Sequence, residues 1–435
     1  MTEMTSRKSY LALLVVPLIL LLISCGVNSN GLPQTNVAGL SPGAPTTSPS
    51  GNVNLTPTML ATTLPKGSDI QYKCIDIQRG NLQLLPIHGT LILLSEKDQS
   101  LENLLFLNLN SGEEKVLPTE DTGIFSVSPK GIYLAYDSWI SNRSRALKIS
   151  DATGNVLMTI DEPEDWYSFE WLTDDNLLIN YPIKNNPLIL LSPFNHQQKI
   201  LEAYGRDNSY IFSDTELIYY WGFYAYHRNV YDPRLTRMLY PSYDDKKDSP
   251  IIVIRDLVSD KDLATFLTNV GWGVSPKWSP DSKKIAIGLN TNTSAMTNGN
   301  NEYEIFVIGR DGEILLSTDL ISLSKTVYTS YLSWSPDGRY IAFRYTTDTD
   351  INKNLELAVL DTLTKQITNY CIKSDIKDLS FVRRDPSPIW SPDSDFLLIE
   401  TVDPETQIQN ALIVDIDNGQ AYLIKTGFVP IGWMK

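Results

Sequence analysis

The stretch Trp334-Ser335-Pro336-Asp337-Gly338 decides the fold, because the chain repeats it. Close copies occupy residues 278–282 (WSPDS) and 390–394 (WSPDS), so the interval is 56 residues both times. An apolar run follows each copy, as in residues 341–343 (IAF). A fixed period of this length indicates one supersecondary unit stacked on copies of itself.

Each repeat predicts four short antiparallel strands. The Trp ends the first strand, and Pro, Asp and Gly then suit successive positions of a tight turn. The apolar run after the turn is the second strand, and residues 355–360 (LELAVL) are typical of a third. Asp311-Gly312 is a strong hairpin signal that leads into a fourth strand at residues 313–316. Four such strands at this spacing describe a blade of a β-propeller.

Weaker copies of the repeat extend the array toward the N-terminus. Residues 127–131 (VSPKG), 171–175 (WLTDD) and 212–214 (FSD) each precede an apolar run. The predicted blade anchors are Val127, Trp171, Phe212, Trp278, Trp334, Trp390 and Trp433.

The two ends of the array have complementary defects. Trp433 has no blade after it, whereas the strands expected between residues 90 and 117 have no anchor before them. We therefore expect residues 429–433 to supply the inner strand of the first blade, which leaves few exposed sheet edges. The predicted fold is an all-β propeller of seven four-stranded blades, closed by N- and C-terminal strands. Six or eight blades stay open, because residues 71–77 could also form a strand and the fourth blade is irregular.

These motifs resemble the TolB-like, WD-like β-propeller repeat of bacterial envelope proteins. The resemblance covers roughly residues 85–435, and its motifs are strongest in the predicted blades five to seven. It implies an extracytoplasmic platform for docking other proteins, although propellers carry many unrelated activities. Some relatives have a serine-hydrolase domain after the propeller, but this sequence contains no Gly-x-Ser-x-Gly motif to supply the nucleophile turn.

The N-terminal segment has the layout of a bacterial lipoprotein. Two basic residues precede an apolar run over residues 11–23, which is short for a membrane span. Leu22-Ile23-Ser24-Cys25 resembles a lipobox, so we expect residues 1–24 to be a signal peptide and Cys25 to be the lipid-attachment residue. The alternative is a transmembrane anchor with an incidental Cys.

A polar segment follows the expected lipid-attachment residue. Residues 25–68 are rich in Pro, Thr, Ser, Asn and Gly and contain no aromatic residue. Such a segment cannot bury enough apolar surface to fold, so we predict a disordered linker that spans on the order of 35 to 40 Å. The propeller domain is expected to occupy residues 69–435 and to reorient freely on its membrane anchor.

Net charge limits the classes of partner that the protein can bind, and the number of cysteines bears on the compartment in which it works. The 435 residues carry a formal net charge of −15, which disfavours binding to nucleic acid and to an anionic lipid surface. If Cys25 is lipidated, Cys74 and Cys371 are the two remaining cysteines. An even pair in an oxidising compartment suggests a disulfide, and two separate buried thiols are the alternative.

The sequence offers no obvious set of metal ligands. The three histidines, His88, His196 and His227, are widely spaced, whereas metal-using propellers need His or carboxylate side chains that converge on the central channel. The alternating oxygen ligands of residues 348–354 lack the central Gly and the closing Glu of a calcium loop. We therefore expect no metal, no cofactor and no catalytic residue.

The predicted fourth blade has the most unusual composition. Residues 219–226 (YYWGFYAY) are densely aromatic, and a long insertion follows at residues 228–249. Tyr and Trp give a large contact area with few rotatable bonds, which favours recognition surfaces. The alternative is that these aromatic side chains pack between blades. The candidate partner-binding residues are Tyr224, Tyr226, Tyr231, Tyr240 and Tyr243.

The sequence thus predicts a lipid-anchored, extracytoplasmic, monomeric propeller without catalytic activity. Its expected work is to dock another envelope protein or peptide on one face of the ring. A glycan-binding module or sensor that uses the blade-four aromatics is one alternative, and exposed coplanar rings would favour it. A propeller lyase or hydrolase with a site in the channel is the other, and it needs convergent His, Asp or Glu side chains.

Overall fold

In the computed structural model, the described residues are 70–78, 86–97, 100–118, 124–141, 144–161, 168–180, 188–201, 230–244, 249–267, 274–290, 303–324, 327–348, 354–374, 387–403 and 405–435. The chain divides into two units, Met1–Asn54 and Leu55–Lys435, and every described residue belongs to the second. The expected signal peptide, Cys25 and the predicted linker lie outside the described residues. No helix in the described part of the chain is long and apolar enough to cross a membrane.

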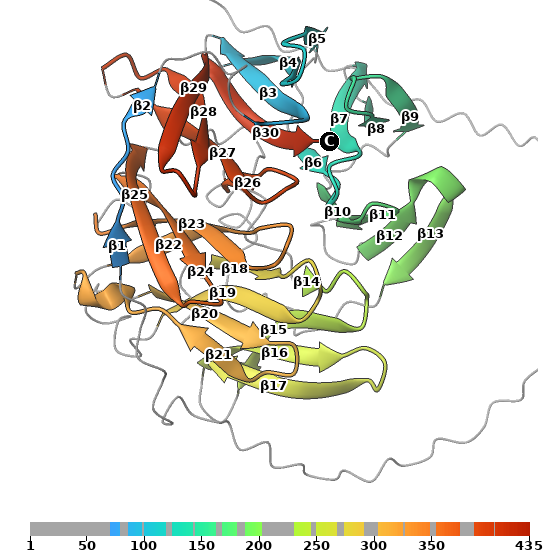
Figure 1. Cartoon of the computed structure of the whole chain (residues 1–435). Coiled ribbons are helices and arrows are strands. Elements are labelled where there is room, and N and C mark those ends of the chain that lie inside the picture. Colours follow the sequence, from blue (N-terminus) through green and yellow to red (C-terminus); the bar gives the residue numbers. More distant parts are fainter. Residues whose placement is uncertain are drawn as a thin grey trace, which may run out of the picture. The chain divides into compact units, whose positions relative to one another are not determined.

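Seven sheets of four antiparallel strands form the blades of a ring, which confirms the predicted seven-bladed propeller (Figure 1). The inner strands of blades one to seven are β30 (Phe428–Met434), β6 (Phe125–Val127), β10 (Ser168–Thr173), β14 (Val230–Tyr231), β18 (Val274–Trp278), β22 (Tyr328–Trp334) and β26 (Ile389–Trp390). The second strands are β3 (Thr90–Lys97), β7 (Leu134–Ser141), β11 (Asn176–Asn180), β15 (Arg237–Asp244), β19 (Lys284–Asn290), β23 (Tyr340–Thr346) and β27 (Phe396–Val402).

The outer half of each blade completes its sheet. The third strands are β4 (Ser100–Asn108), β8 (Ser144–Ser150), β12 (Leu188–Ser192), β16 (Ser249–Asp256), β20 (Tyr303–Gly309), β24 (Leu355–Asp361) and β28 (Gln409–Asp415). The outer strands are β5 (Glu114–Pro118), β9 (Val156–Asp161), β13 (Gln197–Leu201), β17 (Lys261–Leu267), β21 (Ile314–Ser317), β25 (Gln366–Ser374) and β29 (Gln420–Thr426). Two short strands, β1 (Ile70–Tyr72) and β2 (Ile77–Gln78), add a fifth strand to blades six and seven.

The hydrophobic core lies between the blades and runs around the whole ring. Strand β27 shows how one blade serves two neighbours, because successive side chains of a strand point to opposite faces. Leu397 and Ile399 pack in a cluster with blade six, whereas Phe396 and Leu398 pack in a cluster with blade one. Seven such clusters join the seven neighbouring pairs of blades. Both faces of a blade are therefore buried, which explains the nearly continuous apolar runs of the sequence.

Blade one is closed by backbone pairing between the two ends of the propeller. Strand β30 pairs antiparallel with β3, and Trp433 lies opposite Leu91. The Trp433 side chain is buried, and its Nε1 donates a hydrogen bond to the carbonyl oxygen of His88 at 2.9 Å. This closure was predicted from the sequence and is confirmed.

The Ser-Pro-Asp turns are held from within by their serine. In blade seven the Ser391 amide donates to the Phe396 carbonyl (2.8 Å), and the Phe396 amide donates to the Ser391 hydroxyl oxygen (3.0 Å). In blade five the Ser279 hydroxyl donates to Asp281 Oδ1 (2.7 Å), which also accepts the Lys283 amide (3.1 Å). The expected role of the Asp, a bond to local backbone, is therefore confirmed. The residue after the Asp has a positive φ, which is 60° at Ser282, 71° at Gly338 and 72° at Ser394.

The repeated Trp residues are the joints between neighbouring blades. In blades five, six and seven the indole Nε1 donates to the carbonyl that precedes the anchor residue of the previous blade. These bonds run from Trp278 to Val230 (3.0 Å), from Trp334 to Lys277 (2.9 Å) and from Trp390 to Ser333 (3.1 Å). A second contact comes from the residue that follows each turn, because Tyr340 stacks on Trp390 with ring centroids 5.9 Å apart. The anchors are therefore structural, as the repeat predicted.

The anchor of blade four is Tyr231, and the predicted anchor Phe212 is wrong. The indole of Trp278 bonds to Val230, the residue before Tyr231, as the other joints require. Asp232 then replaces the serine of the repeat, because its Oδ1 accepts the amides of Thr236 (2.6 Å) and Arg237 (2.7 Å). The expected insertion at residues 228–249 thus holds the inner half of the blade, whereas Phe212 lies outside the described residues.

Residues 70–78, here named the strap, run along the outer edges of two blades. Strand β1 pairs in parallel with β25 of blade six, and β2 pairs in parallel with β29 of blade seven (Figure 1). Between the two strands a disulfide joins Cys74 to Cys371, whose Cα atoms are 4.7 Å apart. The Lys73 amide also donates to the Asn369 carbonyl at 2.8 Å. The strap therefore fastens neighbouring blades from outside and takes no part in ring closure.

Candidate functional site

Two kinds of turn meet at one end of the ring, which we name the turn face. One kind joins the inner strand to the second strand, and the other joins the third strand to the outer strand. In blade five they are bonded together, because the Arg310 amide donates to the Lys283 carbonyl at 3.0 Å. Blade six repeats the contact between Thr362 and Arg339 at 3.0 Å. The turn face is therefore a rigid platform of short turns.

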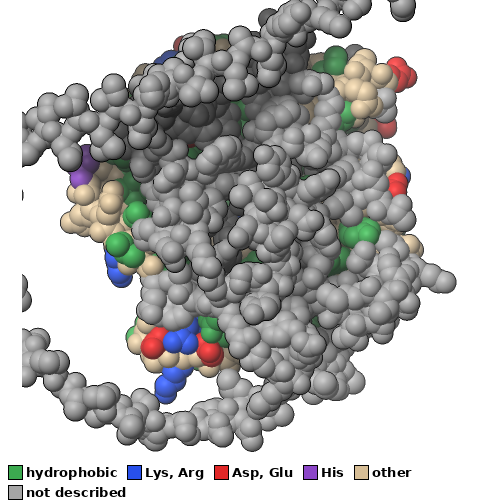
Figure 2. Space-filling view, turned by 180° about the vertical axis from the view of Figure 1, so that it is seen from behind, with side chains coloured by type: hydrophobic (Ala, Val, Ile, Leu, Met, Phe, Trp, Pro, Cys, Tyr) green, Lys and Arg blue, Asp and Glu red, His purple; other side chains and the backbone are tan. Residues whose placement is uncertain are grey.

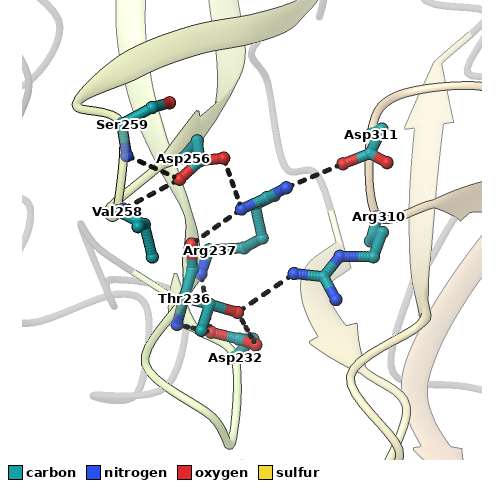
Figure 3. Close-up of polar contacts among 8 residues, drawn as sticks. All are labelled: Asp232, Thr236, Arg237, Asp256, Val258, Ser259, Arg310 and Asp311. Atoms are coloured by element: carbon teal, nitrogen blue, oxygen red, sulfur yellow. Dashed lines mark hydrogen bonds and ion pairs between the residues drawn. The ribbon is translucent and has the colours of Figure 1, made fainter.

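Charges on the turn face between blades four and five are paired (Figure 3). Arg237 bonds to Asp256 in its own blade (2.7 Å) and to Asp311 in blade five (3.0 Å). Arg310 of blade five returns the contact by donating to Thr236 Oγ1 at 3.1 Å. The backbone amides of Ser259 and Val258 donate to Asp256. Together with the positive charge of Arg237, they hold the pKa of the Asp256 carboxyl below its usual range. This network joins blades four and five, and each charge of Arg237 and its partners Asp256 and Asp311 is paired within it.

Blades six and seven carry a group of neighbouring acidic side chains on the same face. The carboxylates of this group, which we name the acidic rim, are Asp337, Asp393, Asp395, Asp415 and Asp417. Burial, and then the nearby charges of Asp393 and Asp417, raise the pKa of Asp395 above its usual value. Elsewhere acidic and basic side chains stand next to one another, as at the lower edge of the view in Figure 2. The acidic rim is therefore named by these five residues alone.

A cleft of about 470 Å³ opens on the turn face at blade one. Its lining residues are His88, Gly89, Thr90, Asn108, Asn110, Ala152, Thr153, Pro392, Asp393 and Lys435. Blades two and five to seven have a Ser-Pro turn between their first two strands, and blade four has its Asp-Pro equivalent. In blade one these two strands are β30 and β3, which come from opposite ends of the propeller and have no covalent turn between them. The cleft thus occupies the place of the missing turn.

Three neighbouring blades build the walls of the cleft. Blade seven contributes Asp393, whose Oδ1 accepts the Ser391 hydroxyl. On the other side, the Lys435 amide donates to the carbonyl of Gly131 in the turn of blade two at 2.8 Å. Between these walls, His88 Nδ1 of blade one lies 3.1 Å from Asn110 Oδ1. Side chains and main chain from blades seven, one and two therefore meet around the cleft.

Two glycines allow the chain to approach this closely. Gly89 has a φ of +99°, and a Cβ there would lie 2.1 Å from the Met434 carbonyl oxygen. Gly131 has a φ of +68°, and a Cβ would lie 3.0 Å from the Trp433 carbonyl oxygen. Any other residue at Gly89 would push β30 away from β3. The shape of the cleft and the closure of the ring thus depend on the same contact.

Partly exposed apolar side chains stand beside the cleft on blades two and three. Phe194 is 39% exposed and Ile132 is 40% exposed. Tyr133 lies between blades, with its ring centroid 4.7 Å from that of Phe194 and 5.7 Å from that of Trp171. Sequence reasoning missed this group, although the aromatic residue directly after a Ser-Pro turn was a usable signal.

The candidate residues of the sequence analysis fall in different places. Tyr231 and Tyr240 are buried at 5% and 8% exposure, in the cluster between blades three and four, so their expected display to a partner is corrected. Tyr240 also donates its hydroxyl to Asp262 at 3.0 Å. Burial follows from the strands that they occupy, and it favours the packing alternative. Tyr224 and Tyr226 lie outside the described residues, as does the side chain of Tyr243.

The remaining predicted residues are placed as follows. The structure bonds Cys74 to Cys371, whereas Cys25 lies outside the described residues. His88 lines the cleft, His196 is exposed in the last turn of blade three, and His227 lies outside the described residues. Among the residues that the structure describes, no group of three or more His, Cys, Asp or Glu side chains could hold a metal ion.

Comparisons with known proteins give similarities of fold. No family model matches the chain, and no curated protein matches it. The crystal structure of TolB from Acinetobacter baumannii is 12% identical with a TM-score of 0.41, over 85% of this chain and 98% of that one. An oligogalacturonate lyase in complex with manganese is 11% identical with a TM-score of 0.46, over 78% and 86%. An uncharacterized protein from Listeria monocytogenes is 10% identical with a TM-score of 0.45, over 82% and 98%.

Proposed function

We propose that this protein is a lipid-anchored, extracytoplasmic propeller without catalytic activity, which docks another protein of the bacterial cell envelope on its turn face. The observation that carries the proposal is the partly exposed apolar group formed by Ile132, Tyr133 and Phe194 on the turn face. Docking surfaces combine a few aromatic or apolar anchors with a polar surround. The turns beneath the group are already fixed by hydrogen bonds, so docking requires little ordering of the platform.

The extracytoplasmic location is supported by the disulfide between Cys74 and Cys371. Disulfides persist in oxidising compartments and are rare in the cytosol. The lipobox-like sequence before Cys25 supports the anchor, and the strap brings the chain to the rim of blades six and seven.

The anchor is tested by the mass of the mature protein. Cys25→Ala should release the protein from the membrane fraction or leave the precursor unprocessed. Wild-type protein should carry a lipid on Cys25, and an intact mass that shows an unmodified Cys25 in the mature protein would contradict the anchor.

Docking is tested by photo-crosslinking in the native envelope. A photoreactive amino acid in place of Phe194 should give a discrete protein adduct. The matched control is Ile200, which is 70% exposed in the outer strand of the same blade and should give none. Ile132→Ser should weaken the adduct at position 194, since it removes a neighbouring anchor. Equal adducts at both positions, or none at position 194, would contradict docking on this face.

A further inference from the structure

The disulfide of the strap lies at the surface of the ring. Cys74 is an exposed residue, whereas Cys371, its partner in blade six, is half-buried. Structural disulfides of secreted proteins resist reduction, but exposed ones have more oxidising potentials and include the labile and regulatory cross-links. Because Cys74 is the more exposed of the two residues, an external thiolate is expected to attack its sulfur and to displace Cys371. The bond therefore has the accessibility of a reversible cross-link.

Apart from the disulfide, the strap is held by short strands and little buried apolar surface. Strand β1 has three residues and β2 has two. Tyr72 is 60% exposed and Ile77 is 48% exposed. Ile70 and Ile75 pack against the core clusters of blades six and seven but stay partly buried. Segments with few buried apolar contacts open locally at a low free-energy cost, so the strap depends on its cross-link.

Lys73 gives the strap a defined position on blade seven. Its Nζ donates to the carbonyl of Asp417 at 2.5 Å, in an exposed contact. A Cβ at Gly419 would lie 2.3 Å from Lys73 Cε, so the turn of blade seven admits the lysine stem only because residue 419 is a glycine. A released strap can therefore return to the same place.

Blade six holds its half of the disulfide without help from the strap. The pairing of β25 with β24 shifts register around Cys371, which lies in a bulge with a φ of +58°. A residue with a side chain keeps this left-handed conformation only where its surroundings fix it. The Cys371 amide donates to Asn369 Oδ1 at 2.6 Å, and the fully buried Asn369 side chain donates in turn to Glu356 of the same blade. The Cys371 thiol should therefore stay in place after reduction.

We propose that the bond between Cys74 and Cys371 is a redox-controlled lock, which a dithiol opens to release the strap. One thiolate of the dithiol attacks Cys74 Sγ and forms a mixed disulfide, while Cys371 leaves as a thiolate and takes up a proton. The second thiol of the dithiol loses its proton and displaces Cys74, which is protonated in turn. The dithiol is thus oxidised to a disulfide, and the protein is reduced to two thiols. The ring stays closed, because β30 pairs with β3 and not with the strap.

Release of the strap changes the outer edges of two blades. Strands β1 and β2 are the fifth strands of blades six and seven, where they cover β25 and β29. Their departure leaves backbone amides and carbonyls of these two outer strands without strand partners. Such an edge accepts an extended segment as an added strand. The lock therefore controls access to two sheet edges, which lie apart from the docking group on the turn face and go beyond the docking function.

The lock is tested by reduction of the full-length protein without denaturant. Millimolar dithiothreitol, a dithiol, should expose Cys74 and Cys371 to an alkylating agent while the near-UV circular dichroism of the ring is retained. Hydrogen exchange should then lose its protection along residues 70–78 and along β25 and β29. Cys74→Ser is the matched control, because it has no cross-link and its exchange should not respond to dithiothreitol.

The direction of attack is tested with reduced glutathione, a monothiol that leaves a mixed disulfide on the protein. After a rapid alkylating quench, peptide mapping should find glutathione on Cys74 at least about tenfold more often than on Cys371. Removal of dithiothreitol should restore the bond between these two residues at a rate that does not depend on protein concentration, since Cys371 keeps its place.

Three results would overturn the proposal. The disulfide is structural and not a lock if dithiothreitol reduces it only after the ring has unfolded. The lock is also rejected if glutathione prefers Cys371, or if residues 70–78 keep their protection from exchange after reduction. All three measurements use wild-type protein, so they decide the matter even if Cys74→Ser fails to fold.

Discussion

The joints between blades five, six and seven differ from the joint that closes blade one. In the first group each blade turns from its inner to its second strand through a covalent Ser-Pro-Asp turn, held by a buried serine. In blade one the same two strands meet only through backbone pairing between β30 and β3. The ring can thus be closed at a blade that has no Ser-Pro-Asp turn. The cleft lies where that turn would otherwise be.

The Trp residue shows the same contrast on a smaller scale. Trp390 donates its indole N–H back to Ser333 of the previous blade, as Trp278 and Trp334 also do within the array. Trp433 instead donates to His88, which leads into β3 at the far end of the propeller. The indole N–H of Trp433 therefore joins the two chain ends, while its ring packs against Phe396 of the neighbouring blade seven.

The largest expected effect comes from removing the closing strand. Deletion of residues 427–435 removes β30 and the buried Trp433, whose truncation alone costs about 3 to 5 kcal/mol. Because blade one loses its inner strand, the whole ring should lose stability in a thermal melt. Removal of Lys435 alone is the control, since Met434 is buried and Lys435 is exposed. A deletion that melts within a few degrees of the full chain would show that the ring closes in another way.

Removal of the disulfide in the strap should have the next largest effect on stability. The double variant Cys74→Ser/Cys371→Ser removes a cross-link between residues 297 positions apart, which should lower the free energy of unfolding by about 2 to 4 kcal/mol. Chemical denaturation of the variant and of wild type with added reductant should agree. Hydrogen exchange should rise along β25 and β29, which β1 and β2 cover, but not along β3. Faster exchange in β3 would mean that the strap also supports closure.

Substitutions in the turns between inner and second strands should have a smaller effect on the free energy of unfolding. They test the blades that have such a turn, which blade one lacks. Ser391→Ala removes the acceptor for the Phe396 amide, and a buried donor left without its partner costs about 1 to 3 kcal/mol. Asp232→Ala should cost more than Ser391→Ala, because Asp232 accepts two amides and the Thr236 hydroxyl. Urea melts of both variants make the comparison. Equal losses would show that the extra bonds in blade four contribute nothing.

The smallest effect lies in the acidic rim. The pKa of Asp395 is raised in the folded state, so the stability linked to it is fully present below its unfolded pKa and is lost as pH rises through the folded value. Asp395→Asn should therefore raise the Tm slightly near neutral pH. The gain should vanish below about pH 4, where the carboxyl is protonated in both states. Thermal melts across this range test the sign.

Asp281 supplies the opposite sign as a control. Burial raises the pKa of Asp281, but hydrogen bonds from the Ser279 hydroxyl and the Lys283 amide outweigh burial and bring this pKa below its usual value. Its contribution is present above the unfolded pKa and is lost as pH falls through the folded one. Asp281→Asn should therefore lower the Tm near neutral pH. A gain in that variant would contradict the lowered pKa of Asp281.

The sequence predicted the ring well where turn chemistry recurs. Trp278, Trp334 and Trp390 stand at equal spacing before the same turn, and each takes the expected place. Closure by β30 was predictable because each end of the array lacks what the other supplies. The first blade has no inner strand before it, and Trp433 has no blade after it. Blade four was misassigned because Asp232 replaces Ser in its turn. The Pro that follows, Pro233, was the available signal, since Pro presets the second turn position.

The candidate site was far less predictable. The cleft combines blades seven, one and two, so its lining residues are brought together only by closure of the ring. His88 and Gly89 carried no motif, and their role depends on a contact with Met434 at the other end of the chain. Composition drew attention to Tyr231 and Tyr240, but both pack between blades three and four and are buried. In this propeller both faces of a blade are covered by its neighbours, so an aromatic side chain on a blade strand packs at a blade joint.

Cross-linking between β30 and β3 tests the central claim, that blade one is closed by backbone pairing of the two chain ends. Ser95 and Phe428 are opposite one another in this pairing, so Ser95→Cys/Phe428→Cys should form a disulfide under mild oxidation. The control pairs Phe428→Cys with Val116→Cys, which lies three strands away in β5 and should not react. Peptide mapping should find positions 95 and 428 linked beside the native pair of Cys74 and Cys371. Free thiols at positions 95 and 428, with the native pair intact, would contradict the closure.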